Sequence, residues 1–282
     1  MGEAKTTSGT CLLMGLLALS TPVGAAELKP AALRGFEQYV RRTEERVHSE
    51  VQNGKTFLWV YSLPAARREE TLEQLRRGEI VMERLEAGPA GRAMVTPGAM
   101  IHHWVGTVLI PGARLAQVLR TIQNYDCHQE YFRPEVVRSR TLERDGDDFT
   151  VYLRLQKTKM VTAVFDTEHQ VHYNRLDAWH AYSESRSTRI TELNHAGEAG
   201  EQALPPGDDH GFLWRLNSYW RFVETREGVY VQCEAVSLTR DIPLGLGWVV
   251  GPFIESIPKE SLNFTLQSTR AAVFRARPDN AL

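Results

Sequence analysis

Cysteine is scarce in this chain of 282 residues, which carries Cys11, Cys127 and Cys233 alone. Cys11 lies in an N-terminal segment that we expect to be removed, so a disulfide-rich framework is excluded. The spacing of Cys127 and Cys233 does not predict a bond between them, and two buried apolar thiols are the simpler interpretation. No paired cysteines have the spacing of a zinc site. We therefore expect neither a metal nor another cofactor.

An excess of one charge sign is also lacking. The 33 Lys and Arg residues nearly balance the 35 Asp and Glu residues, which leaves a net charge of -2. Both signs are interspersed, as in "RTEERVHSE" at residues 42–50, and this is typical of a solvated surface. Nucleic-acid binding calls for a basic patch or stripe, so we expect no nucleic-acid partner.

The apolar run near the N-terminus, "CLLMGLLAL" at 11–19, is too short to span a bilayer, which takes about 20 residues. It fits the apolar core of a secretory signal peptide, and the small residues Val23 and Ala25 suit cleavage near Ala25 or Ala26. We expect a signal peptide at 1–26, export of the chain to the periplasm, and no stable membrane span after cleavage.

Catalytic motifs are mostly missing. The sequence has no G-x-S-x-G, no H-E-x-x-H and no phosphate-binding glycine motif. His102 and His103 are adjacent on an expected strand, so their side chains point to opposite faces, and His169 and His172 differ in parity in the same way. We name no catalytic residue and lean towards a protein without enzymatic activity.

Helical periodicity is present after the signal segment. Leu33, Phe36, Val40, Thr43 and Val47 recur every three or four residues and predict an amphipathic helix. A second helix is predicted within 63–79, where Pro64 lies near its start and Gly78 just beyond its end. A short strand at 80–85 and a linker at 86–98 follow. Whether these helices pack on the rest of the chain stays open.

From residue 99 the pattern changes to alternation with period two. "AMIHHWVGTVLI" (99–110) predicts a strand, and the segment after it predicts one or two short helices. Further strands are expected at 135–144, 148–157, 161–173, 178–192, 212–225 and 229–239. Short polar turns between several of them require antiparallel neighbours. The polar loop 194–211 is the exception, and it is either a flap or disordered.

The last part of the chain combines an apolar connection with a helix. The charge-free run "IPLGLGWVVGPFI" (242–254) follows the last strand, and an amphipathic helix is predicted at about 258–274. Loops are normally polar, so this connection is expected to pack over something apolar. The helix has a wide apolar stripe and must be heavily covered.

Strand parity predicts which face of the sheet is buried. One face collects apolar side chains: Phe149, Val151, Leu153, Leu155, Trp214, Leu216, Trp220, Phe222, Val229, Val231, Cys233 and Ala235. The opposite face carries polar ones: Arg154, Gln156, Arg215, Arg221, Gln232 and Glu234. We expect the apolar face to pack against the last helix and the polar face to be solvated.

This succession resembles the helix-grip fold of the START-like superfamily, which includes lipid-transfer and polyketide-cyclase proteins. The stretches that carry the resemblance are "IHHWVGTVLIPGARLAQVLRTIQNYDCHQEYFRPEVVRSR", "FLWRLNSYWRF" and "GVYVQCEAVSLTRDIPLGLGWVVGPFIESIPKESL". They are similar to exported bacterial START-like proteins without an assigned function. The resemblance implies an α+β fold in which a curved antiparallel sheet surrounds a long C-terminal helix, with an apolar cavity between them.

The implied organisation is a signal peptide at 1–26, a helical extension and linker at 27–98, a START-like ligand-binding domain at 99–275 and a tail at 276–282. Residues 242–254 would form a mobile rim of the cavity, closed by Leu244, Leu246, Trp248, Val249, Phe253 and Ile254. The residues predicted to bind ligand are Trp214, Leu216, Trp220, Phe222, Val231, Leu153, Leu246, Trp248, Phe253, Ile254, Ile257, Phe264, Glu184 and Arg186.

Glu184 and Arg186 enter this set from the polar strand "AYSESRSTRI" (181–190). Either Tyr182, Glu184, Arg186 and Thr188 or the serines between them point inward, and inward polar groups must pair or bind a polar head group. A salt-bridge ladder on the surface is the alternative.

The leading hypothesis is a protein that binds or carries a hydrophobic small molecule or lipid. Burial of the methylene groups of the ligand, worth about 0.8 kcal/mol each, would drive this binding. One alternative is a cyclase or dehydratase acting on a polyketide-like substrate. Another is an envelope interaction protein in which residues 27–90 dock an unknown partner and the cavity is vestigial.

Overall fold

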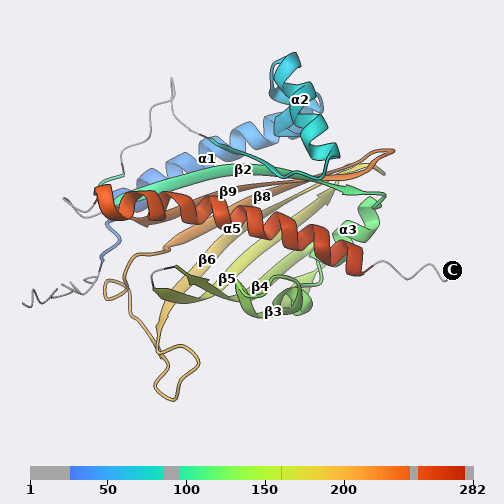
Figure 1. Ribbon diagram of the computed structural model, residues 1–282. Helices are drawn as coiled ribbons and strands as arrows, with labels where there is room; N and C mark the ends of the chain where they lie inside the picture. The colour runs from blue at the N-terminus through green and yellow to red at the C-terminus, as the bar shows by residue number, and fades with distance from the viewer. Residues whose placement is uncertain (1–25, 86–95, 160, 242–246, 277–282) are drawn as a thin grey trace, which may run out of the picture.

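The computed structural model describes residues 26–85, 96–159, 161–241 and 247–276, with the backbone alone described for 247–255. One curved antiparallel sheet dominates this part of the chain, and a long C-terminal helix lies against it (Figure 1). The expected α+β helix-grip class is confirmed. The signal-peptide prediction concerns residues outside the described ones. None of the described helices has the length and apolarity needed to cross a membrane.

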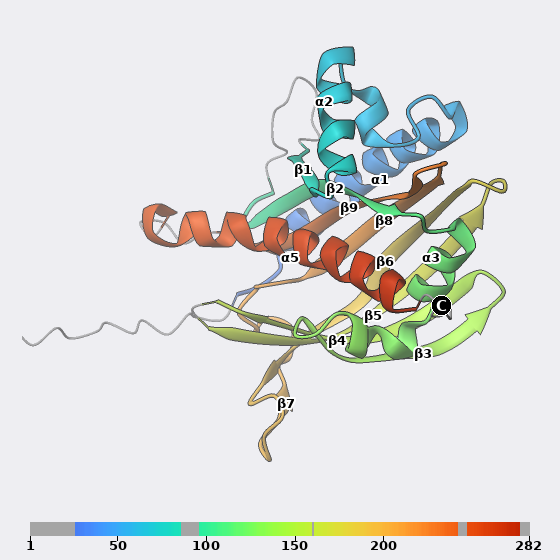
Figure 2. The ribbon, with the colours of Figure 1, turned by 45° about the vertical axis from the view of Figure 1, so that its right-hand side comes forward.

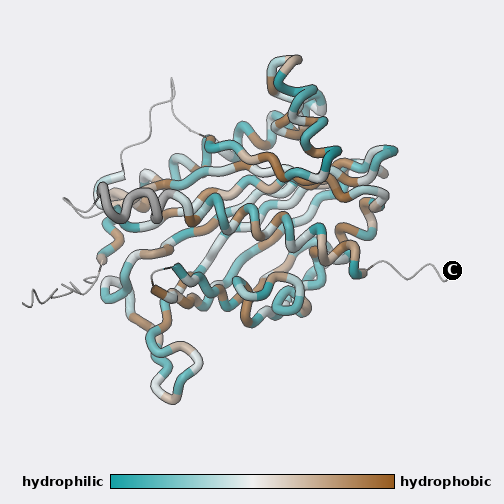
Figure 3. Tube along the Cα trace, viewed as in Figure 1, coloured by the Kyte–Doolittle hydropathy of each residue, from teal (hydrophilic) through white to brown (hydrophobic). Residues whose placement is uncertain are grey.

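Nine strands of the described residues form the sheet, in the order β1-β2-β9-β8-β6-β5-β4-β3, with β7 paired to β6. Their bounds are β1 Val81–Arg84, β2 Ala99–Pro111, β3 Val136–Asp145, β4 Asp148–Thr158, β5 Thr162–Arg175, β6 His180–Asn194, β7 Gln202–Ala203, β8 Arg215–Glu224 and β9 Gly228–Arg240. Every strand expected from alternation is present, within a few residues. The alternation shows as changing colour along the strands (Figure 3).

Two helices contact opposite faces of this sheet. Helix α5 (Gly247–Arg275) lies on the face around which the sheet curves, and α1 (Pro30–Asn53) lies on the other (Figures 1 and 2). Helix α2 (Ala65–Arg76) follows α1, and β1 joins the sheet edge beside β2. The N-terminal helices therefore pack on the sheet. Of the predicted stripe of α1, Phe36, Val40, Thr43 and Val47 are buried and Leu33 is half-buried, while Ala32, Tyr39 and Val51 are buried as well.

The inner core lies between the sheet and α5, with α3 (Leu115–Ile122) at one end. The residues of α5 buried there include Leu262, Leu266, Thr269 and Val273, which fall within about 60° of one another at 100° per residue. Two short turns, η3 (Tyr125–Cys127) and α4 (His128–Tyr131), continue from α3 towards β3. This core gathers Val108, Ile110, Phe149, Val151, Phe222, Val229, Val231 and Cys233.

The expectation of a solvated opposite face is wrong. Arg221 and Gln232 are fully buried and Glu234 is 1% exposed, because α1 and the segment after it cover this face. Arg154, on β4, is 7% exposed, since Glu201 of the loop 194–211 contacts its guanidinium. Parity alone could not reveal a second covering layer, since it shows only which side chains share a face.

The C-terminal helix is longer than predicted. It begins at Gly247, eleven residues before the expected start, and continues through Pro252 and Pro258. Glycine and proline in "IPLGLGWVVGPFI" had indicated a connection, because proline removes a helical hydrogen bond. The predicted rim is thus helical in backbone from Gly247 onwards, which corrects the expected mobile connection there. The side chains of Leu244, Leu246, Trp248, Val249, Phe253 and Ile254 lie outside the described residues.

Cys127 and Cys233 are both free thiols, but only Cys233 is buried as the simpler interpretation predicted. Cys233 is buried in the inner core, whereas Cys127 is half-buried beside Asn124, whose amide nitrogen lies 3.2 Å from its sulfur. Burial raises the pKa of the Cys233 thiol, so that thiol stays protonated at neutral pH.

Candidate functional site

Several predicted ligand-binding residues do lie on the inner face. Phe222 and Val231 are buried in the inner core, and Leu153 and Trp220 pack against it while half-buried. Leu216 pairs in register with Ser237 on the same face and is half-buried. These side chains come from β4, β8 and β9, which bring distant stretches of sequence onto one surface. Their role in binding stays a prediction.

Ile257 and Phe264 of α5 are also half-buried. At 100° per residue both lie about 140–160° from the Leu262 side of the helix. Glu260 lies on their side, and its carboxylate pairs with Lys159 Nζ at the end of β4, 2.7 Å away. This flank of α5 therefore faces the β4–β5 hairpin.

Trp214 does not join this surface. It precedes β8 and is buried in the outer cluster with Ala26. Its indole Nε1 donates to Asp209 Oδ1 at 2.9 Å. The parity prediction fails here because β8 begins at Arg215, and the alternation of a strand does not extend into the preceding loop.

Glu184 and Arg186 point away from α5, which corrects their place in an internal cavity. Arg186 Nε donates to Glu44 Oε1 of α1 at 2.7 Å, and Glu184 Oε1 lies 2.6 Å from His48 Nε2. The other set of the same strand faces inward, because Ser183 pairs in register with Trp220. The salt-bridge alternative describes Glu184 and Arg186 correctly.

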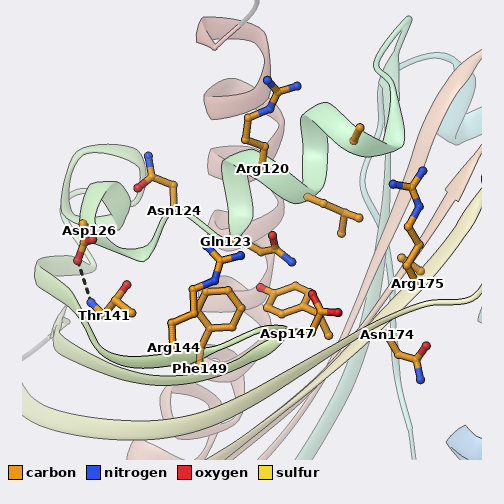
Figure 4. Close-up of a pocket in the computed structure, with 14 residues that line it drawn as sticks. Arg120, Gln123, Asn124, Asp126, Thr141, Arg144, Asp147, Phe149, Asn174 and Arg175 are labelled. Atoms are coloured by element: carbon orange, nitrogen blue, oxygen red, sulfur yellow. Dashed lines mark hydrogen bonds between the residues drawn. The ribbon is translucent and has the colours of Figure 1, made fainter.

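A pocket of about 680 Å³ lies on the inner face at the end capped by α3 (Figure 4). Such a volume falls in the range of about 300–1,000 Å³ common for small-molecule sites. Its walls come from α3 and the loop after it, the β3–β4 hairpin, and the ends of β5 and β6. The residues that line it are Ala116, Leu119, Arg120, Gln123, Asn124, Asp126, Thr141, Arg144, Asp147, Phe149, Tyr173, Asn174, Arg175 and Ala181. None of the predicted ligand-binding residues is among them.

The floor of this pocket is apolar and belongs to the inner core. Phe149, Tyr173 and Ala181 are 3%, 5% and 2% exposed. The ring of Phe149 meets that of Tyr173 edge to face, with centroids 5.6 Å apart. The hydroxyl groups of Tyr173 and Tyr125 form a hydrogen bond of 2.7 Å, and burial raises the pKa of both phenols. Both phenols therefore stay neutral.

Charged residues stand at the rim of the pocket. Arg120 comes from α3, Arg144 from β3 and Arg175 from the end of β5, and all three are exposed. Asp126 Oδ1 accepts the backbone N–H of Thr141 at 2.8 Å, and Asp147 lies in the β3–β4 turn. Sequence reasoning missed this site because its residues are spread over 66 positions and share no motif.

A second, smaller pocket of about 420 Å³ lies over β4, β5 and β6, with Glu184 and Arg186 in its wall. Their neighbours there include Asp145, Asp148 and His172, a mixed and mostly exposed set of charges. His172 is paired with Asp148, its Nδ1 lying 2.8 Å from Oδ1. Phe149 and Val171 are its apolar lining residues, and charged or polar side chains make up the rest.

Two histidines face the inner core and stay neutral. Burial lowers the pKa of His169 and of His102 to about 4, with the nearby charge of Arg84 adding to the effect on His102. His169 Nε2 lies 3.0 Å from the hydroxyl of Thr167, which itself donates to Leu153 O. No group of three or more potential metal ligands is found among the described residues.

A buried polar network under α1 was also missed. Glu234 lies 2.7 Å from His103 Nε2 and pairs with Arg46, and His103 Nδ1 lies 2.7 Å from the hydroxyl of Tyr39. Arg221 pairs with Glu50 at 2.7 Å and donates to the carbonyl of Phe57. Against its burial, the hydrogen bond from His103 and the surrounding positive charges lower the pKa of Glu234 to about 2. The network joins α1 to the sheet.

The strand order and the position of α5 are those of a helix-grip domain. The fold is START-like. No protein-family model matches the chain, and no curated protein matches it in sequence.

Solved structures similar in fold include the Zhui aromatase/cyclase from Streptomyces sp. R1128, 12% identical over 64% of this chain and 99% of its own, with a TM-score of 0.43. A STAR-related lipid transfer protein fragment from Xanthomonas axonopodis is 15% identical over 68% of this chain and 98% of its own, with a TM-score of 0.42. Human STARD10 is 8% identical over 76% of this chain and 82% of its own, with a TM-score of 0.42.

Proposed function

We propose that this protein binds a hydrophobic or amphipathic small molecule on the inner face of its sheet, entered at the pocket beneath α3. The observation that carries the proposal is the pocket of about 680 Å³ with a floor of Phe149, Tyr173 and Ala181. An apolar body placed on this floor loses its contact with water. The gain is about 25 cal/mol per Å² of apolar surface removed from water.

The half-buried side chains further along the inner face support the same function. Leu153, Leu216 and Trp220 of the sheet, with Ile257 and Phe264 of α5, are only partly shielded from water. An acyl chain or ring system that extends from the pocket towards them would cover this apolar surface. A lipid carrier and a carrier of a smaller hydrophobic molecule both fit this surface.

The two alternatives have less support. An enzyme of the cyclase or dehydratase type needs an ionisable group deep in the cavity that changes its protonation during the reaction. The charged groups of this pocket stand at its rim, and burial keeps Tyr173 on its floor and His169 on the inner face neutral. An interaction protein that docks through its first helix needs an apolar patch there, and the apolar stripe of α1 is buried against the sheet. Non-enzymatic binding is therefore the function we favour.

The test blocks the pocket from its exposed side. Ala116 is the second residue of α3, is exposed and lines the pocket, so Ala116→Trp should fill the entrance. Ala66 is the second residue of α2, is exposed and lies outside both pockets, and Ala66→Trp is the matched control. We expect Ala116→Trp to weaken the binding of dodecanoate and dodecanol at least tenfold by calorimetry, with Ala66→Trp unchanged. If both variants bind these ligands with equal affinity, the ligand does not bind in this pocket and the proposed site is rejected.

Ligand identity requires the protein from its own cell. Native mass spectrometry of the purified chain, followed by organic extraction, should reveal a co-purifying hydrophobic molecule. If the purified protein contains no bound molecule and also binds no hydrophobic probe, the proposal that it carries a hydrophobic ligand is rejected.

The proposal includes export to the periplasm, which rests on the apolar run at 11–19 and the small residues Val23 and Ala25. Sequencing the N-terminus of the protein from a periplasmic extract should give a chain that starts near Ala26. A full-length chain confined to the cytosol would contradict export.

A further inference from the structure

Three arginines from three separate elements line the larger pocket. Arg120 lies on α3, Arg144 on β3 and Arg175 at the end of β5 (Figure 4). A guanidinium keeps its positive charge at any physiological pH and presents planar pairs of N–H donors. The pocket thus combines an apolar floor with three permanent cations at its entrance.

Two of these guanidinium groups are held by neutral partners. Arg144 Nε donates to the carbonyl of Gly146 at 3.2 Å. Arg175 Nε donates to the carbonyl of Asp177 at 3.1 Å. A backbone carbonyl orients a guanidinium without cancelling its charge.

The two aspartates that line the pocket form no ion pair with these arginines. Asp126 accepts the backbone N–H of Thr141, and within the described residues neither Asp126 nor Asp147 forms an ion pair with Arg120, Arg144 or Arg175. By contrast, Arg114, at the start of the same helix as Arg120, is paired with Glu224 at 2.8 Å. Among the residues that line the pocket, three arginines stand against two aspartates, an excess of one positive charge.

Arg144 also connects the charged rim to the apolar floor. Its guanidinium carbon lies 4.7 Å from the ring centroid of Phe149, a cation–π distance. The Phe149 ring is buried while the arginine is exposed. A ligand whose apolar group packs near Phe149 therefore has the positive charge of Arg144 next to it.

We propose that the ligand is an amphipathic anion, whose carboxylate or phosphate is bound by Arg120, Arg144 and Arg175 while its apolar part occupies the pocket. This inference rests on the proposed function and adds the charge of the head group. A carboxylate or a phosphate has two oxygen atoms that can accept two parallel hydrogen bonds from one guanidinium group.

The experiment compares ligands of one chain length by calorimetry on the full protein: dodecanoate, dodecyl phosphate and dodecanol, with inorganic phosphate alone as a fourth probe. We expect both anionic amphiphiles to bind at least tenfold more tightly than dodecanol. Their affinity should fall as salt is raised from 50 to 500 mM, whereas that of dodecanol should not. Inorganic phosphate alone should bind too weakly to measure.

The variant Arg144→Gln tests the assigned residue, and Arg140→Gln is its matched control. Both arginines lie on β3 and both stack over an aromatic ring, Arg140 at 5.9 Å from Tyr152, but only Arg144 lines the pocket. Arg144→Gln should lower the affinity for dodecanoate about tenfold and leave the affinity for dodecanol unchanged. Unchanged binding of dodecanol also shows that the pocket of the variant is folded. Arg140→Gln should change neither.

The outcomes separate the two proposals. Dodecanol binding as tightly as dodecanoate, or an Arg144→Gln effect equal for both, would overturn the anionic head group while leaving hydrophobic binding intact. Tight binding of inorganic phosphate alone would overturn the amphiphile, since a free anion would then be the ligand. If none of the amphiphiles binds, the proposed function fails as well.

Discussion

At Gly106 the absence of a side chain lets α5 approach β2. A Cβ atom there would lie 2.6 Å from Leu266 Cδ1 and 3.3 Å from Leu262 Cδ2. Both leucines are buried, so neither can move into solvent. One hydrogen in place of a methyl group therefore sets the distance between the sheet and the helix that it surrounds.

We predict that Gly106→Ala destabilises the protein by about 1–3 kcal/mol, the usual cost of an added methyl group in a packed core. Gly200→Ala is the control, because a Cβ at Gly200 meets nothing within 4 Å. Urea unfolding followed by tryptophan fluorescence measures both. Equal midpoints for the two variants would mean that α5 does not press on Gly106.

Glu234 is a second residue on which the stability of the fold depends strongly. It is almost fully buried and takes part in contacts with His103, Arg46 and Arg221. Removing one partner of a buried ion pair leaves the other charge uncompensated.

We predict that Glu234→Gln lowers the free energy of unfolding by about 3 kcal/mol. Glu168→Gln removes a half-buried partner of the exposed Arg189 and should cost less than about 1 kcal/mol. Denaturant unfolding at pH 7 compares the two. A loss below 1 kcal/mol for Glu234→Gln would show that the network under α1 adds nothing to stability.

At the scale of elements, the loop 194–211 is fastened to the outer side of the sheet. Arg154 of β4 donates from both Nη atoms to Glu201 and also binds Asp166 of β5. Glu201 in turn accepts the N–H of Gly197 at 2.8 Å, and β7 pairs with β6. The polar composition had left open a flap or disorder, and these contacts hold the loop against β4 and β6, away from the pocket beneath α3.

We predict that Glu201→Gln loosens this loop and accelerates its cleavage by a protease at low concentration, at least threefold. Glu198→Gln, in the same loop, changes a carboxylate that contacts only exposed His195 and should leave the rate near that of the original chain. Mass spectrometry of the fragments locates the cut. Identical rates for both variants would mean that the Arg154–Glu201 pair does not restrain the loop.

At the scale of the whole molecule, both faces of the sheet are covered, and this burial leaves three histidines neutral. Burial lowers the pKa of His102, His128 and His169 to about 4, compared with 6.5 in the unfolded chain. Between these values the unfolded chain binds protons that the folded one does not. Stability is therefore present above pH 6.5 and falls as the pH drops towards 4.

We predict a loss of about 1.4 kcal/mol per pH unit for each of these histidines between pH 6.5 and 4. Below pH 4.5 Glu234 adds a further loss, since its stabilisation disappears as the pH approaches 2. Urea unfolding at several pH values measures the slope. His169→Gln should reduce it, and His172→Gln, exposed on the same strand, should not. A slope unchanged by His169→Gln would contradict a neutral buried His169.

How much of the site could be predicted differs from residue to residue. Phe222 and Val231 were assigned to the inner core correctly, because alternation along a strand is a local property. Arg144, Phe149 and Arg175 were not recognised together as a pocket, since they meet only when β3, β4 and β5 pair and α3 closes their end. Arg221 and Glu234 were predicted to be solvated, because no local pattern in β8 and β9 reveals that α1 lies over them.

The succession of strands along the chain and most of the buried stripe of α1 followed from the sequence, because periodicity and turn residues act over a few positions. The START-like class was predicted from the resemblance of three stretches to that superfamily. The second covered face, the length of α5 through its prolines and the pocket with three arginines were decided by tertiary structure. These depend on which elements meet across large sequence separations, such as the 188 positions between Arg46 and Glu234. No short stretch of the sequence determines the energy of such contacts, because each one joins residues from distant parts of the chain.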